Sequence, residues 1–313
     1  MTKGKAKTKY VKKLSLEKVL KKGPAGFNYI KQQTGLTRTD AIKQIKKLKK
    51  NGVHVENYLN AKYVPQFYIN NNPTNIVNNF DLGLKEGNYV LGFESDLHMG
   101  DKAHKEDAHN KAYDEYEDAG VIAILDAGDL TTGVNVYRGQ QADLSYHTLD
   151  DQIQYVVDTH PSISGVKKHV IGGNHDYDSL KSCGINPLTV IQSKRDDIKF
   201  IGWSDAKINI GGGVTFELCH YKGSMAWSLG YRAQKFLRDC DASSMPDILG
   251  LGHKHVAMYA NIQGVHSLEG GTFQGQNNFT KERGLHGSVC SWIIEYTIEA
   301  GKISKFKPEL LVF

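Results

Sequence analysis

Five short apolar runs in this chain each end in histidine, aspartate or asparagine. In chain order they cover residues 89–95, 121–127, 168–171, 214–219 and 248–251. Apolar runs of this length that are bounded by glycine and polar residues are typical of buried strands. In open α/β sheets, ligands bind in the crevice beyond the carboxyl ends of the strands. If all five strands lie in one sheet system with their ends together, their polar endings converge on a single site.

The polar residues that follow these runs form a set of nitrogen and oxygen ligands without a thiolate. They are Asp96, His98, Asp129, Asn174, His175, His220, His253 and His255. Such a set is suited to binding a manganese, iron, zinc or nickel ion, and it differs from a structural zinc site, whose ligands are thiolates. In the D-x-H and H-x-H segments the ligands are two apart, so both point to the same side of an extended chain. Eight residues are too many for one ion, but the number is reasonable for two ions about 3.5–4 Å apart that share a bridging carboxylate.

The motifs D-x-H, G-D, G-N-H-D, a lone histidine and G-H-x-H follow one another in this order, each after an apolar run. Together they resemble the calcineurin-like metallophosphoesterase superfamily over roughly residues 88–296. The resemblance implies an α/β fold, a four-layer α/β/β/α sandwich in which two facing β-sheets are flanked by helices. It also implies a site for two divalent metal ions at the ends of the sheets, with manganese expected first and iron, zinc or nickel as alternatives.

The resemblance assigns a role to each residue of the motifs. Asp96, His98 and His255 match ligands of the first metal ion, Asp129 matches the bridging ligand, and Asn174, His220 and His253 match ligands of the second ion. His175 matches the residue that contacts the scissile phosphate and is usually assigned the leaving-group proton, and Asp176 matches the carboxylate behind it. Contact with the phosphate alone would explain His175 equally well. Histidines outside the motifs are expected to be surface or hydrogen-bonded residues.

The chemistry of this ligand set can be argued from the residues themselves. A phosphoester resists attack because its oxygens are negatively charged and water is a poor nucleophile. Two divalent cations neutralise that charge and lower the pKa of bound water from 15.7 toward about 7. An imidazole, whose ordinary pKa is near 6.5, can protonate the leaving alkoxide near neutral pH when a carboxylate holds it. The set therefore predicts a metal-dependent phosphoesterase.

The segments around the motifs favour a phosphodiesterase or nuclease over a protein phosphatase. Leu130-Thr131-Thr132-Gly133 stands where serine/threonine phosphatases continue G-D-x-V-D-R-G, and G-N-H-D replaces their G-N-H-E. This pattern is closer to the nuclease and phosphodiesterase branches, including the nuclease subunit of double-strand-break repair complexes and small phage or prophage exonuclease-like proteins. Tyr137, Arg138 and Arg232 are candidates for substrate contact, since a ring can stack on a base and a guanidinium can bind phosphate. Each of them could instead lie on a helix surface.

Charge is divided unevenly along the 313 residues. The first fifty residues contain 16 Lys or Arg and two acidic residues, a net charge of +14, whereas the remainder has a net charge of −9. This division predicts a basic module joined to an acidic one. We expect a disordered basic tail over 1–13, a small domain over 14–70, a linker over 71–86 and the metallophosphoesterase domain over 87–313.

The basic module has the pattern of three short helices followed by a hairpin. The helices are expected from Ser15, over residues 27–33 and over residues 37–50, and the hairpin over residues 53–69. This order resembles winged helix-turn-helix domains, which implies binding of duplex DNA with the third helix in the major groove. The residues expected to contact DNA are Arg38, Lys43, Lys46, Lys47 and Lys50. A solvated lysine-rich helix in a protein-interaction module is the alternative.

Taken together, these patterns predict a DNA nuclease that a basic N-terminal domain delivers to its substrate. The alternatives are a small-nucleotide or cyclic-nucleotide phosphodiesterase, and a DNA-binding regulator whose metallophosphoesterase domain is structural. Four cysteines without a C-x-x-C spacing indicate free thiols. The sequence shows neither a long apolar segment nor a signal peptide, so we expect a soluble cytoplasmic protein.

Overall fold

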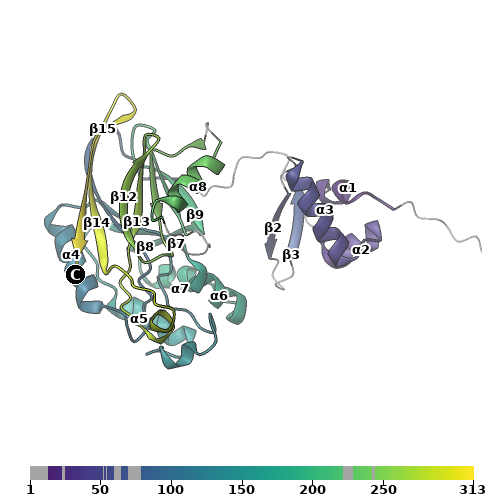
Figure 1. Cartoon of the computed structure of the whole chain (residues 1–313), viewed down its shortest axis with the longest axis horizontal. Coiled ribbons are helices and arrows are strands. Elements are labelled where there is room, and N and C mark those ends of the chain that lie inside the picture. The colour runs from purple at the N-terminus through teal and green to yellow at the C-terminus, as the bar shows by residue number, and fades with distance from the viewer. Residues whose placement is uncertain are drawn as a thin grey trace, which may run out of the picture. The chain divides into compact units, whose positions relative to one another are not determined.

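The computed structural model describes residues 13–22, 25–51, 53, 55–59, 65–69, 79–220, 228–241 and 244–313. The chain divides into two compact units, Met1–Ile76 and Val77–Phe313 (Figure 1). The expected basic tail lies almost wholly outside the described residues. The same holds for His54 and residues 60–64 of the expected hairpin and for the first half of the expected linker. The division between the two units falls inside that linker.

In the part of the first unit that the structure describes, three helices pack with a small antiparallel sheet. Its elements are α1 (Leu16–Lys21), β1 (Ala25–Gly26), α2 (Phe27–Thr34), α3 (Arg38–Lys50), β2 (Val55–Leu59) and β3 (Pro65–Ile69). Ser15 caps α1 by accepting a hydrogen bond from the amide of Lys18, and Gly35, at a φ of 75°, ends α2. The strand order β1-β3-β2 adds a short strand to the expected hairpin, and one apolar cluster around Leu20 and Ile30 joins the helices to the sheet. The resemblance of this unit to a winged helix stays a prediction.

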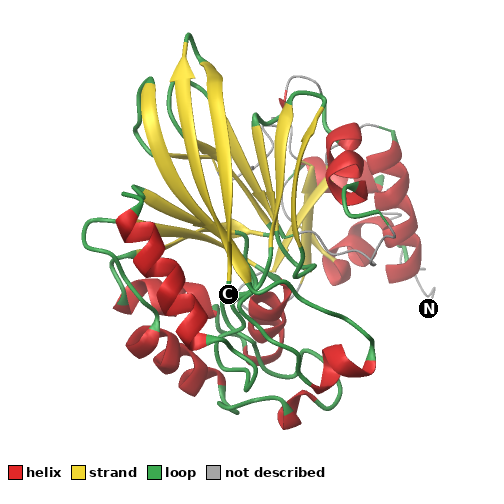
Figure 2. Cartoon of the chain, turned by 60° about the vertical axis from the view of Figure 1, so that its left-hand side comes forward, coloured by secondary structure: helices red, strands yellow, loops and turns green. Residues whose placement is uncertain are grey.

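Two six-stranded sheets form the second unit (Figure 2). The first sheet has the order β15-β14-β5-β6-β7-β8, and the second has the order β12-β13-β11-β10-β9-β4. The strands of the first sheet are β5 (Gly87–Glu94), β6 (Ala123–Asp126), β7 (Lys167–Gly172), β8 (Ile198–Trp203), β14 (Cys290–Glu299) and β15 (Lys302–Val312). Those of the second are β4 (Asn79–Asp81), β9 (Asp205–Asn209), β10 (Thr215–Cys219), β11 (Ile248–Leu251), β12 (Ala257–Ile262) and β13 (Val265–Gly270).

A core of apolar side chains joins the inner faces of the two sheets. Phe93 of β5 contacts Phe216 of β10 with ring centroids 5.6 Å apart, and Leu125 and Leu268 belong to the same buried cluster. The helices of this unit are α4 (Glu106–Asp118), η1 (Gln140–Ala142), α5 (Leu149–Thr159), α6 (Asn174–Cys183), α7 (Pro187–Lys194), α8 (Tyr231–Asp239) and α9 (Asn278–Glu282). Apolar clusters pack α4, α5 and α7 against the first sheet and α8 against the second. The predicted fold class, two facing sheets flanked by helices, is confirmed.

All five strands predicted from the apolar runs are present, as β5, β6, β7, β10 and β11. β5, β6 and β7 run parallel to one another, and β10 runs parallel to β11. The carboxyl ends of parallel strands lie at the same edge of a sheet, so the polar residues that follow these strands are brought together. Within the described part of the chain, no helix has the length and apolar character that crossing a bilayer requires.

Candidate metal centre

Residues that follow five different strands come together at one edge of the two sheets. Three overlapping groups have ligand atoms that all lie within 4.8 Å of one another: Asp96, His98 and His255; His98, Asp129 and His175; and Asp129, His220 and His253. His98 and Asp129 each belong to two of these groups. The three groups therefore form one continuous site.

The backbone at this site adopts an unusual conformation. Five of the motif residues have φ between 48° and 81°: Asp96, His98, Asp129, His253 and His255. Residues other than glycine rarely adopt this left-handed region, and strained conformations of this kind cluster at functional sites. The expectation that the D-x-H and H-x-H segments are extended is wrong, because a positive φ turns the chain at each ligand.

Asp96 and two histidines form the first group. The Nε2 atoms of His98 and His255 lie 3.1 Å apart, and Oδ1 of Asp96 lies 3.3 Å from Nε2 of His255. Oδ2 of Asp96 accepts hydrogen bonds from the hydroxyl of Ser95 at 2.6 Å and from the amide of His253 at 2.7 Å. Oδ1 is buried and accepts no hydrogen bond from the described residues. A cation beside the two facing imidazole nitrogens would satisfy this buried oxygen.

Asp129 lies between this first group and the second. Its Oδ2 is 3.1 Å from Nε2 of His220 and 3.9 Å from Nε2 of His98. The same nitrogen of His220 is 3.3 Å from Oδ1 of Asn174, while Nδ1 of His220 bonds to the carbonyl of Ala127 at 2.6 Å. That bond directs the Nδ1 proton to the backbone and leaves Nε2 to face the site. Oδ2 of Asp129 thus lies within 4 Å of ligand-type nitrogens of both groups.

The electrostatics of the site fit bound cations. Burial opposes ionisation of Asp96 and Asp129, but the neighbouring histidines keep the pKa of both carboxyls well below the usual range. Burial lowers the pKa of His98 to about 4 and the pKa of His253 to about 3, so both imidazoles are neutral at pH 7. Burial opposes a charge on His220 as well, yet the carboxylate of Asp129 raises its pKa to about 9. Metal ions bind ionised carboxylates and neutral imidazoles, so a bound ion would replace the proton of His220.

His175 and Asp176 lie in the first turn of α6 and have separate partners. Nδ1 of His175 bonds to the carbonyl of Thr132 at 2.7 Å. The carboxylate of Asp176 accepts hydrogen bonds from the amides of Gly173 and Thr131, both at 3.0 Å, and from the hydroxyl of Thr131 at 2.7 Å. Contrary to expectation, a backbone carbonyl and not Asp176 holds the imidazole, because adjacent residues of a helix do not face each other. Asp176 instead joins the turn before α6 to the loop after β6.

Two glycines of the motifs permit the close approach of these loops. A Cβ added to Gly173 would overlap Oδ1 and the amide nitrogen of Asp129, and one added to Gly252 would overlap the hydroxyl of Ser95. Any other residue would therefore displace a ligand or the group that holds a ligand. The G-N-H-D and G-H-x-H motifs need glycine for the packing of the site itself.

Comparison with known proteins finds distant relatives. No family model matches the chain. It is similar to the DNA polymerase II small subunit of Methanothermobacter thermautotrophicus, with 25% identity over 240 residues that cover 63% of this chain and 50% of that protein. The DNA polymerase II small subunit of Methanocaldococcus jannaschii is 27% identical over 244 residues, which cover 62% of this chain and 40% of that protein. The chain thus spans half or less of the length of these curated relatives. A solved archaeal phosphodiesterase is similar over 71% of this chain and 99% of that chain, with 14% identity and a TM-score of 0.41.

The motif order, the two facing sheets and the convergence of the motif side chains agree with the superfamily that the sequence resembles. Residues 77–313 thus have the architecture that this resemblance implies, two facing sheets flanked by helices. We refer to these residues below, by this resemblance, as the metallophosphoesterase domain.

A cavity of about 430 Å³ opens beside the candidate metal centre of the metallophosphoesterase domain. Of the three residues expected to contact substrate, Tyr137 lines this cavity, Arg138 is exposed outside its lining, and Arg232 is buried. The guanidinium of Arg232 pairs with Glu269 at 2.9 Å and donates to the carbonyl of Gly252, also at 2.9 Å. Arg232 therefore supports the loop that carries the G-H-x-H motif.

The cavity is also lined by residues outside the site positions selected from the sequence. These residues are Val136, Asp178, Lys254, Gln274, Asn277, Phe279, Thr280, Leu285, His286 and Gly287. Most of them lie in the long segment between β13 and β14, where no motif or periodic pattern marks them. The length of this segment, which runs from residue 271 to residue 289, was the available signal. His286 was expected to be a surface or hydrogen-bonded residue, and it is exposed at the cavity.

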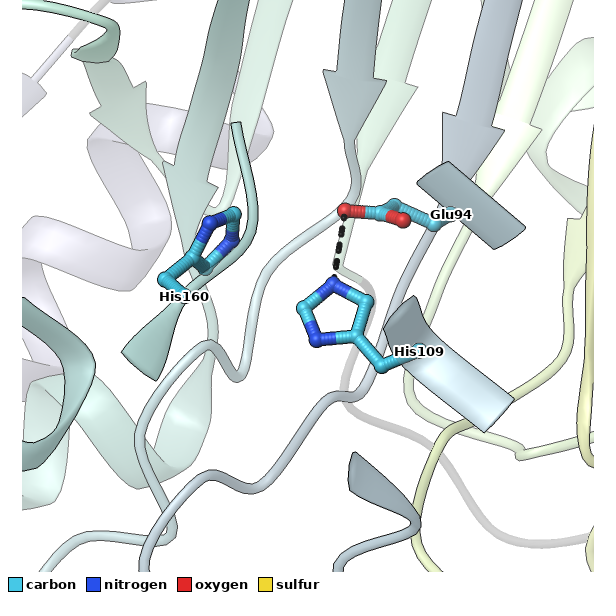
Figure 3. Close-up of side chains that lie close together, drawn as sticks. All are labelled: Glu94, His109 and His160. Carbon is cyan, nitrogen blue, oxygen red and sulfur yellow. Dashed lines mark ion pairs between the residues drawn. The ribbon is translucent and has the colours of Figure 1, made fainter. Parts of the chain in front are cut away.

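A further buried group of ligand-type side chains lies outside the metal centre. Glu94, His109 and His160 have ligand atoms within 4.8 Å of one another, and Figure 3 shows Glu94 and His109 turned toward each other. The ammonium of Lys168, however, lies 2.6 Å from Oε1 of Glu94 and 2.9 Å from Nε2 of His160. It also lies 2.7 Å from Oδ2 of Asp126. Lys168 supplies the positive charge that a metal ion would otherwise bring, so this group is a buried ion-pair network.

The basic residues expected to contact DNA lie on α3 of the first unit. Arg38, Lys43, Lys46, Lys47 and Lys50 are all exposed. Ala41 and Ile45 of the same helix are buried in the core of the unit. The helix thus has one apolar and one basic face, as its periodicity predicts. Contact of the basic face with DNA stays a prediction.

Proposed function

We propose that the metallophosphoesterase domain cleaves phosphodiesters with two divalent metal ions, and that its substrate is DNA. The observation that carries the proposal is the position of Asp129, whose Oδ2 faces His220 on one side and His98 on the other. A carboxylate placed between two sets of nitrogen and oxygen ligands suits a pair of metal ions that act together on one phosphate.

The ligand residues divide between two ions. Asp96, His98 and His255 would hold one ion, Asn174, His220 and His253 would hold the other, and Asp129 would contact both. When bound, the ions would neutralise the phosphate oxygens and lower the pKa of bound water. The protein itself fixes the ligand atoms, since the carbonyl of Ala127 orients His220 and the hydroxyl of Ser95 orients Asp96. Manganese suits this donor set, with iron, zinc or nickel as alternatives.

His175 is suited to protonate the leaving oxygen. The carbonyl of Thr132 accepts a hydrogen bond from Nδ1, which fixes the ring while the residue lines the cavity. When both ring nitrogens carry protons, Nε2 can give its proton to the leaving group while Nδ1 keeps its bond to Thr132. The amide of His175 also donates to Oδ1 of Asp129 at 2.7 Å, so the proton donor and the bridging ligand are fixed to each other.

Two observations support DNA as the substrate. The first unit exposes a row of basic side chains on α3, and basic groups that face phosphates release counterions. The two curated relatives are named as subunits of DNA polymerase II. A small-nucleotide phosphodiesterase is the second candidate function, because a cavity of about 430 Å³ lies in the lower part of the range for small-molecule sites.

Hydrolysis by the purified full chain tests this proposal. The substrates are duplex DNA, single-stranded DNA, cyclic nucleotides and a phosphopeptide, each with Mn²⁺ and with a chelator. Metal-dependent cleavage of DNA supports the proposal, and cleavage of cyclic nucleotides alone supports the second candidate. Hydrolysis of the phosphopeptide alone contradicts both.

The role of the first unit is tested in the same assay with charge-neutralised variants. Replacing Lys43, Lys46 and Lys47 with glutamine should weaken DNA cleavage and reduce its salt dependence, because fewer counterions are released on binding. The matched control replaces the exposed Lys199, Lys302 and Lys305 of the metallophosphoesterase domain, which changes the net charge equally. Equal losses in the two triple variants would contradict the assignment of DNA binding to α3.

A further inference from the structure

Two aromatic side chains from separate loops form one wall of the cavity beside the metal centre. Tyr137 follows β6, and Phe279 lies in α9, yet their ring centroids are 4.3 Å apart with an interplanar angle of 37°. Both residues line the same cavity as His98 and His175. The two rings thus pack against each other beside the residues that would hold the metal ions.

Two buried carboxylates hold this aromatic wall in place. Asp143 accepts hydrogen bonds from the hydroxyl of Tyr137 at 2.9 Å and from the side-chain amide of Asn278 at 2.6 Å. Asp101 accepts hydrogen bonds from the side chains of Gln274 at 2.8 Å and Asn277 at 2.9 Å. Both carboxylates are only 4% exposed. The wall is therefore built by the fold and does not depend on a ligand to bring the two loops together.

The chemistry of the wall matches a nucleobase. Nucleobases stack on aromatic side chains whatever their sequence, because every base has a π-face. The guanidinium of Arg283 lies 3.8 Å from the centroid of the Phe279 ring, on the face that Tyr137 leaves open. A base that stacks on Phe279 would therefore take the place of this exposed, positively charged side chain. Lys254 and His286 line the same cavity and can face a second phosphate of the chain. An aromatic wall with basic groups around it is suited to a nucleotide rather than to an aliphatic phosphoester.

The wall also distinguishes unpaired from paired bases. In a duplex, the faces of each base are covered by the neighbouring base pairs, so a base reaches an aromatic ring only after it leaves the stack. An unpaired base can reach the ring without the free-energy cost of leaving a duplex. We propose that the substrate is single-stranded DNA, in which an unpaired base next to the cleaved phosphate stacks against Tyr137 and Phe279. This inference rests on the proposed phosphodiesterase function and specifies its substrate.

The test compares oligonucleotides that differ only in their bases. The full chain with Mn²⁺ is assayed on a thymidine oligonucleotide, on an abasic oligonucleotide of the same length and on a blunt hairpin duplex. Stacking on an aromatic side chain typically changes affinity between about 5- and 150-fold. The wild type should therefore cleave the thymidine oligonucleotide faster than the abasic one by a factor in this range, and faster than the duplex.

Variants of the wall should remove this preference. In F279L, the ratio of kcat/KM for the thymidine and abasic oligonucleotides should fall toward one, whereas F279W should keep it because it retains an aromatic face. Y146L is the matched control, because Tyr146 stacks on Tyr155 with centroids 4.6 Å apart and does not line the cavity. Thermal unfolding of each variant shows whether it folds.

The outcomes separate this inference from the proposed function. Equal cleavage of the thymidine and abasic oligonucleotides by the wild type, faster cleavage of the duplex, or an unchanged ratio in a folded F279L would overturn the stacking site. Hydrolysis of bis-p-nitrophenyl phosphate by the wild type would still support the phosphodiesterase in each of these cases. Failure to hydrolyse any of these substrates with Mn²⁺ would overturn the proposed function itself.

Discussion

Replacing Lys168 with methionine should lower the free energy of unfolding by about 3–5 kcal/mol. The side chain of Lys168 is 2% exposed, and its ammonium lies 2.6 Å from Glu94 and 2.7 Å from Asp126. Both of these carboxylates are fully buried. Methionine has a similar length but no charge, so the substitution leaves two buried carboxylates without their cation. Loss of one partner from a buried ion pair typically has a cost of this size, because the remaining charge is uncompensated.

The change should be visible in thermal and urea unfolding of the full chain. A domain of this size loses roughly 2–4 °C for each kcal/mol, so the midpoint should fall by roughly 6–20 °C. The three tryptophans, Trp203, Trp227 and Trp292, all belong to the second unit. Tryptophan fluorescence therefore reports the unfolding of the metallophosphoesterase domain without a signal from the first unit.

Two control variants distinguish charge from packing. Lys167 is the exposed neighbour of Lys168 on β7, so K167M should change the free energy of unfolding by less than about 0.5 kcal/mol. The triple variant E94Q/D126N/K168M removes the buried charges together and should be more stable than K168M alone. If K168M unfolds within about 1 kcal/mol of the wild type, the explanation by buried charge is refuted.

Three further predictions concern the metal centre, the proton donor and a surface ion pair. In D129N, the manganese content measured by elemental analysis should fall from two ions per chain to one or none, and a content of two would exclude a bridging role for Asp129. In H175N, kcat should fall by about 10²–10⁴-fold on DNA. It should fall by less on bis-p-nitrophenyl phosphate, because the leaving group of that substrate needs no proton. Equal losses on the two substrates would mean that His175 only contacts the phosphate. Partial burial opposes ionisation of Asp197, but the hydrogen bond and charge of Arg195 lower its pKa below the ordinary 3.8. The stability that this ion pair contributes should therefore be present above about pH 4 and lost as the pH falls further. The difference in urea midpoint between wild type and R195Q should shrink on acidification. A difference that stays constant with pH would argue against an ionic contribution.

Local pattern was enough to predict five strands and most of the side chains that converge at the candidate metal centre. Apolar runs of four to seven residues correspond to β5, β6, β7, β10 and β11. Because the carboxyl ends of parallel strands meet at one edge, the polar residues after these runs could be expected to converge. The conformation of the ligand turns was not predictable in this way, since a spacing of two does not distinguish an extended segment from one with positive φ.

Other features depend on partners that are distant in the sequence. Lys168 meets Glu94 across 74 positions, and Tyr137 meets Phe279 from a different loop. Arg232 was expected at the substrate and is instead buried against Glu269. No motif marks these contacts, because each partner alone has an ordinary local sequence.

The amino-acid sequence by itself determined five of the strands, where they end and which ligand types stand at their ends. These properties follow from the periodicity of side chains along a few neighbouring residues. Only the tertiary structure decided that Thr132 and not Asp176 holds His175, that Lys168 neutralises a buried group of possible ligands, and that two loops close an aromatic wall beside the metal centre. The physical reason is that such contacts arise from the order of the strands and the direction of each helix, which bring together residues that no local pattern connects.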